Sequence, residues 1–560
     1  MKLPSLVAYA LSLSLTAAKV IPDDAPDPNG SAVQRHLMAR SAMITIEKRQ
    51  RQDHEFRQNL SAVARQADVI VQAIRQEEID DYWRQYGTFE HPEDERFAGE
   101  MFPLARPYIN ATKLWQIVKR MPKGALLHAH LSAMLPYENA TVAFAHVNTT
   151  IDTSVETISS ADYVPNTQVS VQIAADQFPG GRQGFIDFMK SKLTILPEDS
   201  IRHELGVDEI WRRFQACFGP ADTMLNYEPI VRTFYQKLFE RLADDGINWV
   251  EIRSGGSSGK LVHTGQEDTD PDLDVWWDVM IDEIEKFQAT DKGKNFWGAR
   301  VIWSDTRSKN REKITKSMKI ALERKQKFPE LFSGYDLVAQ EDLGRPLSDL
   351  APELIWFREQ TEYLNLTIPF FFHAGETLGD GNSTDYNLVD AVLFNSRRIG
   401  HGFSLYKHPT LIEEVIEKAV MVEVCPISNE VLRLATDILH HPLPAMIAHG
   451  VPTAISNDDP AILGQDIAGL SYDFYQTIQG FDNIGLAGLG ALAQNSLRWS
   501  NFEDQSDADW LRDIDLAARG DGIKAQRIQY WNQQWEEFCQ WIVSEYGDQY
   551  PPAQVAAVAH

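Results

Sequence analysis

Seven residues of the chain combine the side-chain types that hold a metal ion and that move protons. They are His128, His130, His373, Glu376, His401, Asp458 and Asp459. Each follows an apolar, strand-like run. Neutral imidazoles and carboxylates are common zinc ligands, and a bound zinc ion lowers the pKa of water to about 7. Because the set also leaves acids and bases over for proton transfer, it predicts a metal-dependent hydrolase.

The run LLHAH contains the first two histidines. Side chains alternate along a strand, so His128 and His130 point to the same face. Taken alone this pair is weak evidence, because histidine pairs also arise by chance in cores and on surfaces. The adjacent carboxylates of Asp458 and Asp459 repel each other and need a cation or a proton nearby. Helix capping is the structural alternative for this doublet.

The other candidates stand next to glycines. His373 ends the most apolar run of the chain, and Glu376 follows it after one tight turn. A glutamate is a poor core residue, and it becomes a good proton donor when desolvation raises its pKa. His401 lies between Gly400 and Gly402, and glycine allows close approach of the backbone to a ligand. A core histidine and a turn histidine are the structural alternatives for the two imidazoles.

Four of the seven residues are predicted to hold one zinc ion and to leave a position open for water. They are His128, His130, His373 and Asp458. The mixture of nitrogen and oxygen ligands suits zinc, while cobalt, iron and manganese stay open as alternatives.

Eight strand-like runs alternate with helical stretches and would position these residues. The runs cover 124–131, 247–255, 296–303, 333–342, 368–376, 398–402, 420–428 and 452–456. Several are nearly continuous apolar runs, as expected for parallel strands that are buried on both faces. Eight βα units predict an α/β fold, the TIM (β/α)8 barrel, whose active site lies at the carboxyl ends of the strands. The candidate residues stand at those ends.

The segments outside these strands predict how the rest of the chain is organised into domains. Residues 34–115 are expected to form an N-terminal helical extension, either a collar on the main domain or an arm for homodimerisation. The barrel domain is expected over 116–545, with an insertion between its first two strands at about 135–205. This insertion would cover the barrel mouth as a lid, bind a surface partner, or do both. Residues 546–560 are expected to form a C-terminal tail.

Charge and cysteine content exclude some classes of protein. The chain has 560 residues and a formal net charge of −27, which repels nucleic-acid backbones and argues against a polynucleotide partner. The three cysteines Cys217, Cys425 and Cys539 are far apart, so at most one disulfide could form. The sequence contains no CxxC pair, which excludes the Cys-ligated nucleobase deaminase pattern.

The N-terminus predicts a secreted glycoprotein. Residues 1–18 have the positive start, short apolar stretch and small-residue cleavage site of a signal peptide, and 19–33 form a flexible lead-in. The apolar stretch is too short to span a bilayer, and no later stretch is long and apolar enough. The N-x-S/T glycosylation sequons agree with secretion. They are Asn29, Asn59, Asn110, Asn139, Asn148, Asn365 and Asn382.

Taken together, the motifs MPKGALLHAHLSAM, VEIRSG, HAGET, RIGHG, VCPISN and SNDDP resemble those of the metal-dependent adenosine deaminase family. The N-terminal part and the segment from WRRFQ to VEIRSG resemble its secreted, growth-factor-related subgroup. The resemblance covers roughly residues 35 to 540. It implies conversion of adenosine or 2′-deoxyadenosine to inosine and ammonia, by attack of zinc-bound hydroxide on the purine C6, with one zinc ion per chain.

The resemblance also implies a role for each site residue. His128, His130, His373 and Asp458 bind zinc. Glu376 protonates the purine N1. His401 orients the zinc-bound water and assists its deprotonation. Asp459 holds the attacking hydroxide.

Two positions depart from the family pattern on the substrate side. Many members have an aspartate where this chain has Ser132, and a glycine where it has Ala339. The aromatic side chain of Trp211 or Phe214 would line the purine pocket. Because a lost carboxylate could admit a 5′-phosphate, deamination of AMP or another 6-aminopurine stays open. A broader amidohydrolase, or a secreted signalling or binding protein on the same barrel, are the further alternatives.

Overall fold

The computed structural model describes residues 27–86, 95–136, 150–152, 168–170, 175–255, 261–263, 266, 268–466 and 469–551. The predicted signal peptide 1–18, the sequons Asn139 and Asn148, and much of the predicted insertion lie outside the described residues. The chain divides into two compact units, Met1–Arg49 and Gln50–His560. The first unit contains most of helix α1 (Ser31–Gln50), which buries none of its residues.

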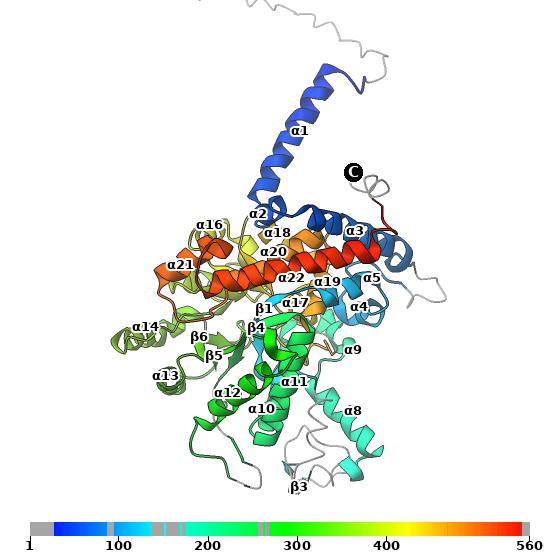
Figure 1. The fold of residues 1–560 in the computed structure, drawn as a ribbon. Helices are drawn as coiled ribbons and strands as arrows, with labels where there is room; N and C mark the ends of the chain where they lie inside the picture. The colour runs from blue at the N-terminus through cyan, green and yellow to red at the C-terminus, as the bar shows by residue number, and fades with distance from the viewer. Residues whose placement is uncertain are drawn as a thin grey trace, which may run out of the picture. The chain divides into compact units, whose positions relative to one another are not determined.

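The second unit begins with a series of short and medium-length helices. They are α2 (His54–Gln58), α3 (Ala62–Glu78), the π-helix η1 (Ile79–Trp83), α4 (Phe102–Ile109) and α5 (Lys113–Arg120). Helix α3 begins at a serine cap, because the side chain of Ser61 accepts a hydrogen bond from Ala64 N. One apolar face of α3 is buried, including Ile70 and Ile74, and packs on α20 and α22 (Figure 1).

Eight parallel strands form two four-stranded sheets. The first has the order β1-β4-β5-β6, from β1 (Gly124–His130), β4 (Ile247–Ser254), β5 (Gly298–Thr306) and β6 (Phe332–Val338). The second has the order β10-β9-β8-β7, from β7 (His373–Ala374), β8 (Arg398–His401), β9 (Met421–Val424) and β10 (Thr453–Ile455). The predicted parallel α/β architecture is confirmed, and all eight strands lie within or beside the predicted runs.

Single parallel bridges connect the edges of the two sheets. Tyr335 of β6 pairs with Phe370, just before β7, and Ala129 of β1 pairs with Asp458, just after β10. Hydrogen bonds accompany both bridges: Phe371 N donates to Tyr335 O at 3.0 Å, and Asp458 N donates to His128 O at 3.1 Å. The segment that carries Asp458 therefore lies directly beside the strand that carries the histidine pair.

Helices alternate with these strands along the chain, and Figure 1 shows several of them around β4, β5 and β6. Between β1 and β5 they are α8 (Gly181–Leu193), α9 (Pro197–Ser200), α10 (Gly206–Met224), α11 (Glu228–Asp244) and α12 (Val275–Gln288). Between β5 and β10 they are α13 (Arg311–Lys327), α14 (Leu347–Tyr363), α15 (Asn387–Leu393), α16 (Pro409–Glu417), α17 (Pro426–Val431) and α18 (Leu443–Ala448). After β10 come α19 (Gly469–Gly480), α20 (Gly485–Arg498), α21 (Asp507–Leu516) and α22 (Ile523–Tyr546).

Short elements complete the fold. The 3-10 turns are η3 (Leu131–Ala133), η4 (His203–Leu205), η5 (Gly293–Asn295), η6 (Phe403–Lys407), η7 (Ile438–His440) and η8 (Ala517–Arg519). Within the predicted insertion, β2 (Thr150–Asp152) pairs antiparallel with β3 (Gln168–Ser170). Within the described segments, no helix combines the length and the apolar character that crossing a membrane requires.

Three predicted strands end clearly earlier than expected. The run 333–342 is a strand only to Val338, and the other two contain proline. The run 420–428 is a strand only to Val424, because Pro426 has no N–H for a ladder and begins helix α17. The run 368–376 forms regular strand only at His373–Ala374, and Pro369 in its first half likewise lacks an N–H donor. Both changes shorten strands whose carboxyl ends still reach the candidate site.

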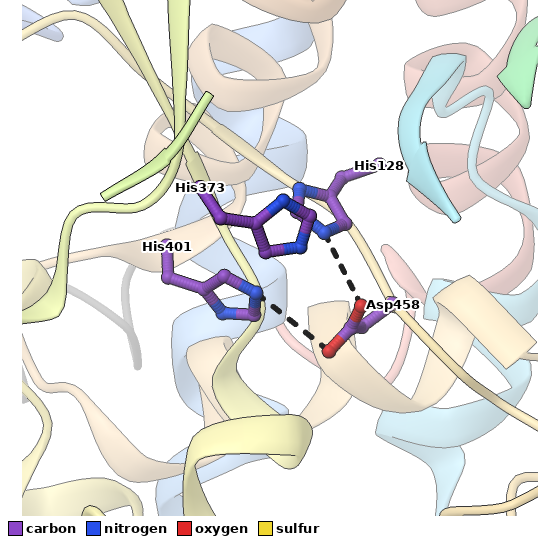
Figure 2. A group of neighbouring side chains, drawn as sticks. All are labelled: His128, His373, His401 and Asp458. Atoms are coloured by element: carbon purple, nitrogen blue, oxygen red, sulfur yellow. Dashed lines mark ion pairs between the residues drawn. The ribbon is translucent and has the colours of Figure 1, made fainter. Parts of the chain in front are cut away.

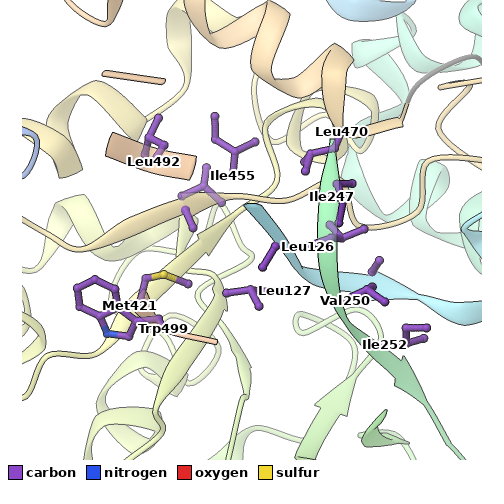
Figure 3. Close-up of a cluster of buried hydrophobic side chains, with 14 of the residues drawn as sticks. Leu126, Leu127, Ile247, Val250, Ile252, Met421, Ile455, Leu470, Leu492 and Trp499 are labelled. Atoms are coloured by element: carbon purple, nitrogen blue, oxygen red, sulfur yellow. The ribbon is translucent and has the colours of Figure 1, made fainter. Parts of the chain in front are cut away.

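The core joins both sheets and the helices around them. Figure 3 shows Leu126 and Leu127 of β1 in one cluster with Val250 of β4, Met421 of β9 and Ile455 of β10. Leu470 of α19 and Leu492 of α20 complete its helical side. Each of these side chains is at most 1% exposed, so burial of apolar surface holds the strand ends in a fixed arrangement.

Candidate active site and metal centre

The strand ends bring the seven predicted residues into one place. The ligand atoms of His128, His373, His401 and Asp458 all lie within 4.8 Å of one another (Figure 2), and those of His130, Asp458 and Asp459 form a second such group. The histidines come from β1, β7 and β8, while the aspartates follow β10. These groups therefore converge from four strands although up to 331 positions separate them (459 − 128 = 331).

The carboxylate of Asp458 is shared among the imidazoles. Its Oδ1 lies 3.2 Å from Nε2 of His128 and 3.2 Å from Nε2 of His130. Its Oδ2 accepts a hydrogen bond from Ser428 Oγ at 2.7 Å and lies 3.8 Å from Nε2 of His401. Oδ2 is thus held by the hydroxyl group of Ser428, whereas Oδ1 faces the ring nitrogens of His128 and His130.

Several of these buried atoms have no hydrogen-bond partner among the described residues. They are Nε2 of His128, Nε2 of His401, Oδ1 of Asp458 and Oδ1 of Asp459. The contact between His128 and Asp458 is close, but it lacks hydrogen-bond geometry. Leaving a buried polar atom unsatisfied costs about 1–3 kcal/mol, so the convergence of four such atoms needs an explanation. A metal cation between Nε2 of His128 and Oδ1 of Asp458 would satisfy these two atoms, and the set of imidazoles and carboxylates around them fits such an ion.

Two buried carboxylates orient the histidines. Oε2 of Glu423 lies 2.8 Å from Nδ1 of His128, and Oδ2 of Asp336 lies 2.7 Å from Nδ1 of His373. Each carboxylate accepts a hydrogen bond from Nδ1–H, which leaves the Nε2 lone pair facing the centre. This second layer is typical of histidine-bound metals. Sequence reasoning missed both residues, although each is a charged residue inside an otherwise apolar strand.

Arg253 connects the two orienting carboxylates. Its Nε lies 2.7 Å from Asp336 Oδ2, and its Nη2 lies 2.6 Å from Glu423 Oε2. Burial alone would raise the pKa of Glu423, but Arg253 and then Arg398 hold that pKa well below its ordinary value. Both carboxylates therefore stay ionised and can accept from the histidines. An isolated buried carboxylate would be too costly in this interior.

Backbone conformation at the site is unusual. His401 and Asp458 have φ angles of 62° and 56°, the left-handed region that non-glycine residues rarely adopt. Such conformations cost about 1–3 kcal/mol each and concentrate at functional sites. Gly400 is needed for packing: a Cβ at this position would lie 2.8 Å from Cε1 of His128. We expected the glycines around His401 to let the backbone approach a ligand. At Gly400 the group that lies close to the backbone is the imidazole of His128.

Glu376 is buried beside the cluster. Its Oε1 lies 3.4 Å from Nδ1 of His401. Glu341 holds the turn that presents it, because its carboxylate accepts from Gly375 N at 3.2 Å and from Glu376 N at 2.9 Å. Burial raises the pKa of Glu376 well above its ordinary value, and the nearby charges of Asp458 and Glu341 add to this. Glu376 therefore keeps its proton to a higher pH than an ordinary glutamate and can donate it.

A cavity of about 610 Å³ opens over the cluster. The predicted substrate-side residues Ser132, Trp211 and Ala339 all line it, as does Phe214. Glu376 and Asp459 line it too. The cavity thus brings an acid, a carboxylate and aromatic walls to one space of the size that takes a small ligand. Trp211 and Phe214 come from α10, which follows the predicted insertion.

Comparison with known proteins identifies the family. The sequence model of the adenosine deaminase family matches residues 187–516, which is more than half of the chain. This chain belongs to the adenosine deaminase family. The resemblance predicted from the motifs, to the family and to its growth-factor-related subgroup, is therefore confirmed.

Similar family members come from vertebrates and an insect. Adenosine deaminase 2-A of Danio rerio is 33% identical over 421 residues, covering 72% of this chain and 80% of that protein. Adenosine deaminase 2 of Sus scrofa is 33% identical over 422 residues, covering 72% and 79%. An adenosine deaminase of Lutzomyia longipalpis is 32% identical over 447 residues, covering 77% and 80%.

The cysteines take no part in the site. Cys217, Cys425 and Cys539 all lie in described segments, are buried, and are unpaired. Burial raises the pKa of each thiol above its ordinary value, so the reactive thiolate is disfavoured. The single disulfide that the sequence allowed does not form among them.

Proposed function

We propose that this chain is a secreted, zinc-dependent adenosine deaminase. It converts adenosine, or 2′-deoxyadenosine, to inosine and ammonia by hydrolysis at the purine C6. The observation that carries the proposal is the set of partnerless metal-ligating atoms under a cavity that also holds a buried glutamate with a raised pKa. The relatives named above, all adenosine deaminases, support the same substrate.

The two sheets form one closed (β/α)8 barrel in this proposal. The bridges Tyr335–Phe370 and Ala129–Asp458 support closure, because they connect the two remaining pairs of sheet edges. A barrel of this kind builds its active site at the carboxyl ends of its strands, where the histidines and aspartates lie.

The metal is one zinc ion held by His128, His130, His373 and Asp458. The orienting carboxylates support His128 and His373 as ligands, because each leaves Nε2 free for a metal. Zinc, when bound, would lower the pKa of water at the site to about 7 and so supply a nucleophile at neutral pH.

Residues of the chain itself then donate and accept the protons of the reaction. Glu376 donates to the purine N1, which makes C6 more electrophilic. Oδ1 of Asp459 is buried, partnerless among the described residues, and at the cavity wall, so it can accept the proton of the attacking water. His401 orients that water. A positioned acid or base contributes about 10²–10⁴-fold in rate.

The charges of the cavity favour a nucleoside over AMP. Beyond the metal cluster, the charged side chains among the described lining residues are Asp222, Arg253 and Lys309. Arg253 is bonded to two carboxylates, and Nζ of Lys309 lies 2.7 Å from Oδ1 of Asp305. A 5′-phosphate would thus meet no unpaired lysine or arginine in this wall. Asp222 hydrogen-bonds Ser132 and offers a carboxylate to a ribose hydroxyl.

Exposed sequons support secretion as a glycoprotein. Five of the predicted glycosylation sites lie in described segments, and all five are exposed. They are Asn29, Asn59, Asn110, Asn365 and Asn382. Secretion is tested by expression of the full chain in eukaryotic cells, with protein and glycosidase-sensitive mass sought in the medium.

The activity is tested with purified zinc-loaded protein and a panel of adenosine, 2′-deoxyadenosine and AMP, with ammonia as the readout. We expect release from both nucleosides and much less from AMP. No ammonia from adenosine would refute the proposed activity, and faster release from AMP would replace the nucleoside by a nucleotide.

A further inference from the structure

A chain of buried hydrogen bonds leads from helix α18 to His401. Leu443 N donates to Nδ1 of His441 at 3.0 Å. Nε2 of His441 lies 2.9 Å from Oδ1 of Asn429, and Nδ2 of Asn429 lies 3.4 Å from Nδ1 of His401. The side chains of Asn429, His441 and His401 are all buried, so no water competes for these contacts.

The direction of every bond in this chain follows from its first member. A backbone N–H can only donate, so Nδ1 of His441 must carry a lone pair. Burial lowers the pKa of His441 to about 3, so the ring is neutral and its one proton is on Nε2. That proton needs an acceptor, which makes the atom of Asn429 that faces His441 the amide oxygen. The amide NH₂ group then faces His401.

The backbone around Asn429 keeps this side chain in place. Asn429 N donates to Cys425 O at 3.1 Å within α17, and Asn429 O accepts from Leu434 N at 2.8 Å and from Ala435 N at 3.0 Å. With the backbone fixed, the side-chain amide is held by its own two contacts, to His441 and to His401. Because it donates to Nδ1 of His401, that nitrogen must carry the lone pair.

We infer that Asn429 and His441 are positioning residues that fix the proton of neutral His401 on Nε2. His401 therefore presents an N–H, not a lone pair, to the metal centre. It cannot serve as a zinc ligand, although it lies in the same cluster as His128, His373 and Asp458. It also cannot take a proton from the attacking water through Nε2, and instead donates a hydrogen bond that orients it. This inference rests on the proposed function.

Groups on the other sides of the ring agree with this assignment. Nε2 of His401 lies 3.8 Å from Oδ2 of Asp458, whose negative charge favours a proton there. Oε1 of Glu376 lies 3.4 Å from Nδ1 without hydrogen-bond geometry. The O–H group of a protonated Glu376 can donate to Nδ1, and such a bond would also place the lone pair on that nitrogen. An ionised Glu376 would instead accept from Nδ1–H and so favour the proton on that nitrogen.

The test is the isosteric substitution Asn429→Asp. A carboxylate accepts where the amide donated, so the proton of His401 moves to Nδ1 and the lone pair turns to the centre. We expect kcat to fall about 10²- to 10⁴-fold, with one zinc ion per chain retained. The ¹⁵N shifts of His401, assigned with the variant His401→Gln, should show the Nε2–H tautomer in the natural protein and Nδ1–H in Asn429→Asp.

A double-mutant comparison separates this role from simple damage. Glutamine in place of His401 can present an amide N–H near the Nε2 position and has no tautomers. Asn429→Asp should therefore reduce kcat far less in the His401→Gln background than in the natural one. His441→Leu should lower kcat as well, whereas its exposed neighbour His440 can be changed to leucine without effect.

Three results would overturn the inference. They are an Nδ1–H tautomer of His401 in the natural protein, an unchanged kcat in Asn429→Asp, and an equal loss in both backgrounds. The tautomer is read without substrate, so it is independent of whether adenosine proves to be the substrate.

Discussion

Oε2 of Glu423 lies 2.8 Å from Nδ1 of His128, and this contact decides which ring nitrogen His128 turns toward the metal centre. Glu423 is fully buried and remains ionised because Arg253 and Arg398 face it. The ligand and its orienting group lie on strands β1 and β9, which are 295 residues apart.

Glu423→Gln should weaken zinc binding. A glutamine amide can donate to Nδ1 of His128, which moves the ring proton to Nε2 and removes the lone pair from the centre. We expect the zinc affinity to fall about 10- to 100-fold, measured by competition with a chromophoric chelator. The matched control is Glu417→Gln on the exposed face of α16. Equal zinc affinity in the Glu423→Gln variant and the natural protein would remove Glu423 from this role.

Gly400→Ala should disturb the same histidine by steric contact. The new Cβ would lie 2.8 Å from Cε1 of His128 and 3.3 Å from Cα of His373, so the ring must move away from its zinc-binding position. We expect loss of zinc and of activity. Gly219→Ala is the control, because its Cβ would meet nothing within 4 Å. A Gly400→Ala protein that holds zinc normally would show that the ring can shift freely.

Glu376→Gln should keep zinc and lose turnover. The acid donates its proton to the substrate, so its removal should lower kcat about 10²–10⁴-fold, while metal analysis still finds one zinc ion per chain. The protonated form is the active one, and its pKa is raised. Activity should therefore be full at pH below this raised pKa and decline as the pH rises through it. Turnover that survives in Glu376→Gln would assign the proton transfer to another group.

Glu430 should make stability depend on pH. It is buried on α17, its Oε1 has no partner among the described residues, and burial raises its pKa well above the ordinary value. In the unfolded chain it loses its proton near its usual pKa of about 4.3. Its contribution to stability is thus full below that pH and is lost as the pH rises toward the folded pKa. Glu430→Gln should flatten this decline in urea unfolding measured from pH 5 to pH 8; an unchanged decline would contradict the assignment.

The sequence predicts the parallel strands well, because apolar runs and their spacing are local properties. The candidate ligands could be found in the same way, since His128 and His373 stand at the ends of such runs. Glu423 and Asn429 could not be assigned, because their partners depend on which strands become neighbours. A one-residue change in strand register would turn Glu423 away from His128.

Element boundaries were predicted less well where proline intervenes. Pro426 ends β9 and begins α17, and this early helix is what carries Ser428 and Asn429 toward the site. The cavity wall from α10 was predicted only through Trp211 and Phe214, whereas Asp222 was missed because nothing local distinguishes it from a solvated aspartate.

The central claim is that side chains from four strands converge on one zinc ion that the reaction needs. The most direct measurement is the zinc content of the purified protein together with its adenosine deaminase rate, before chelation, after chelation and after zinc is restored. We predict one zinc ion per chain, loss of ammonia release with loss of zinc, and recovery of both together. Undiminished ammonia release from protein without a bound metal would contradict the account.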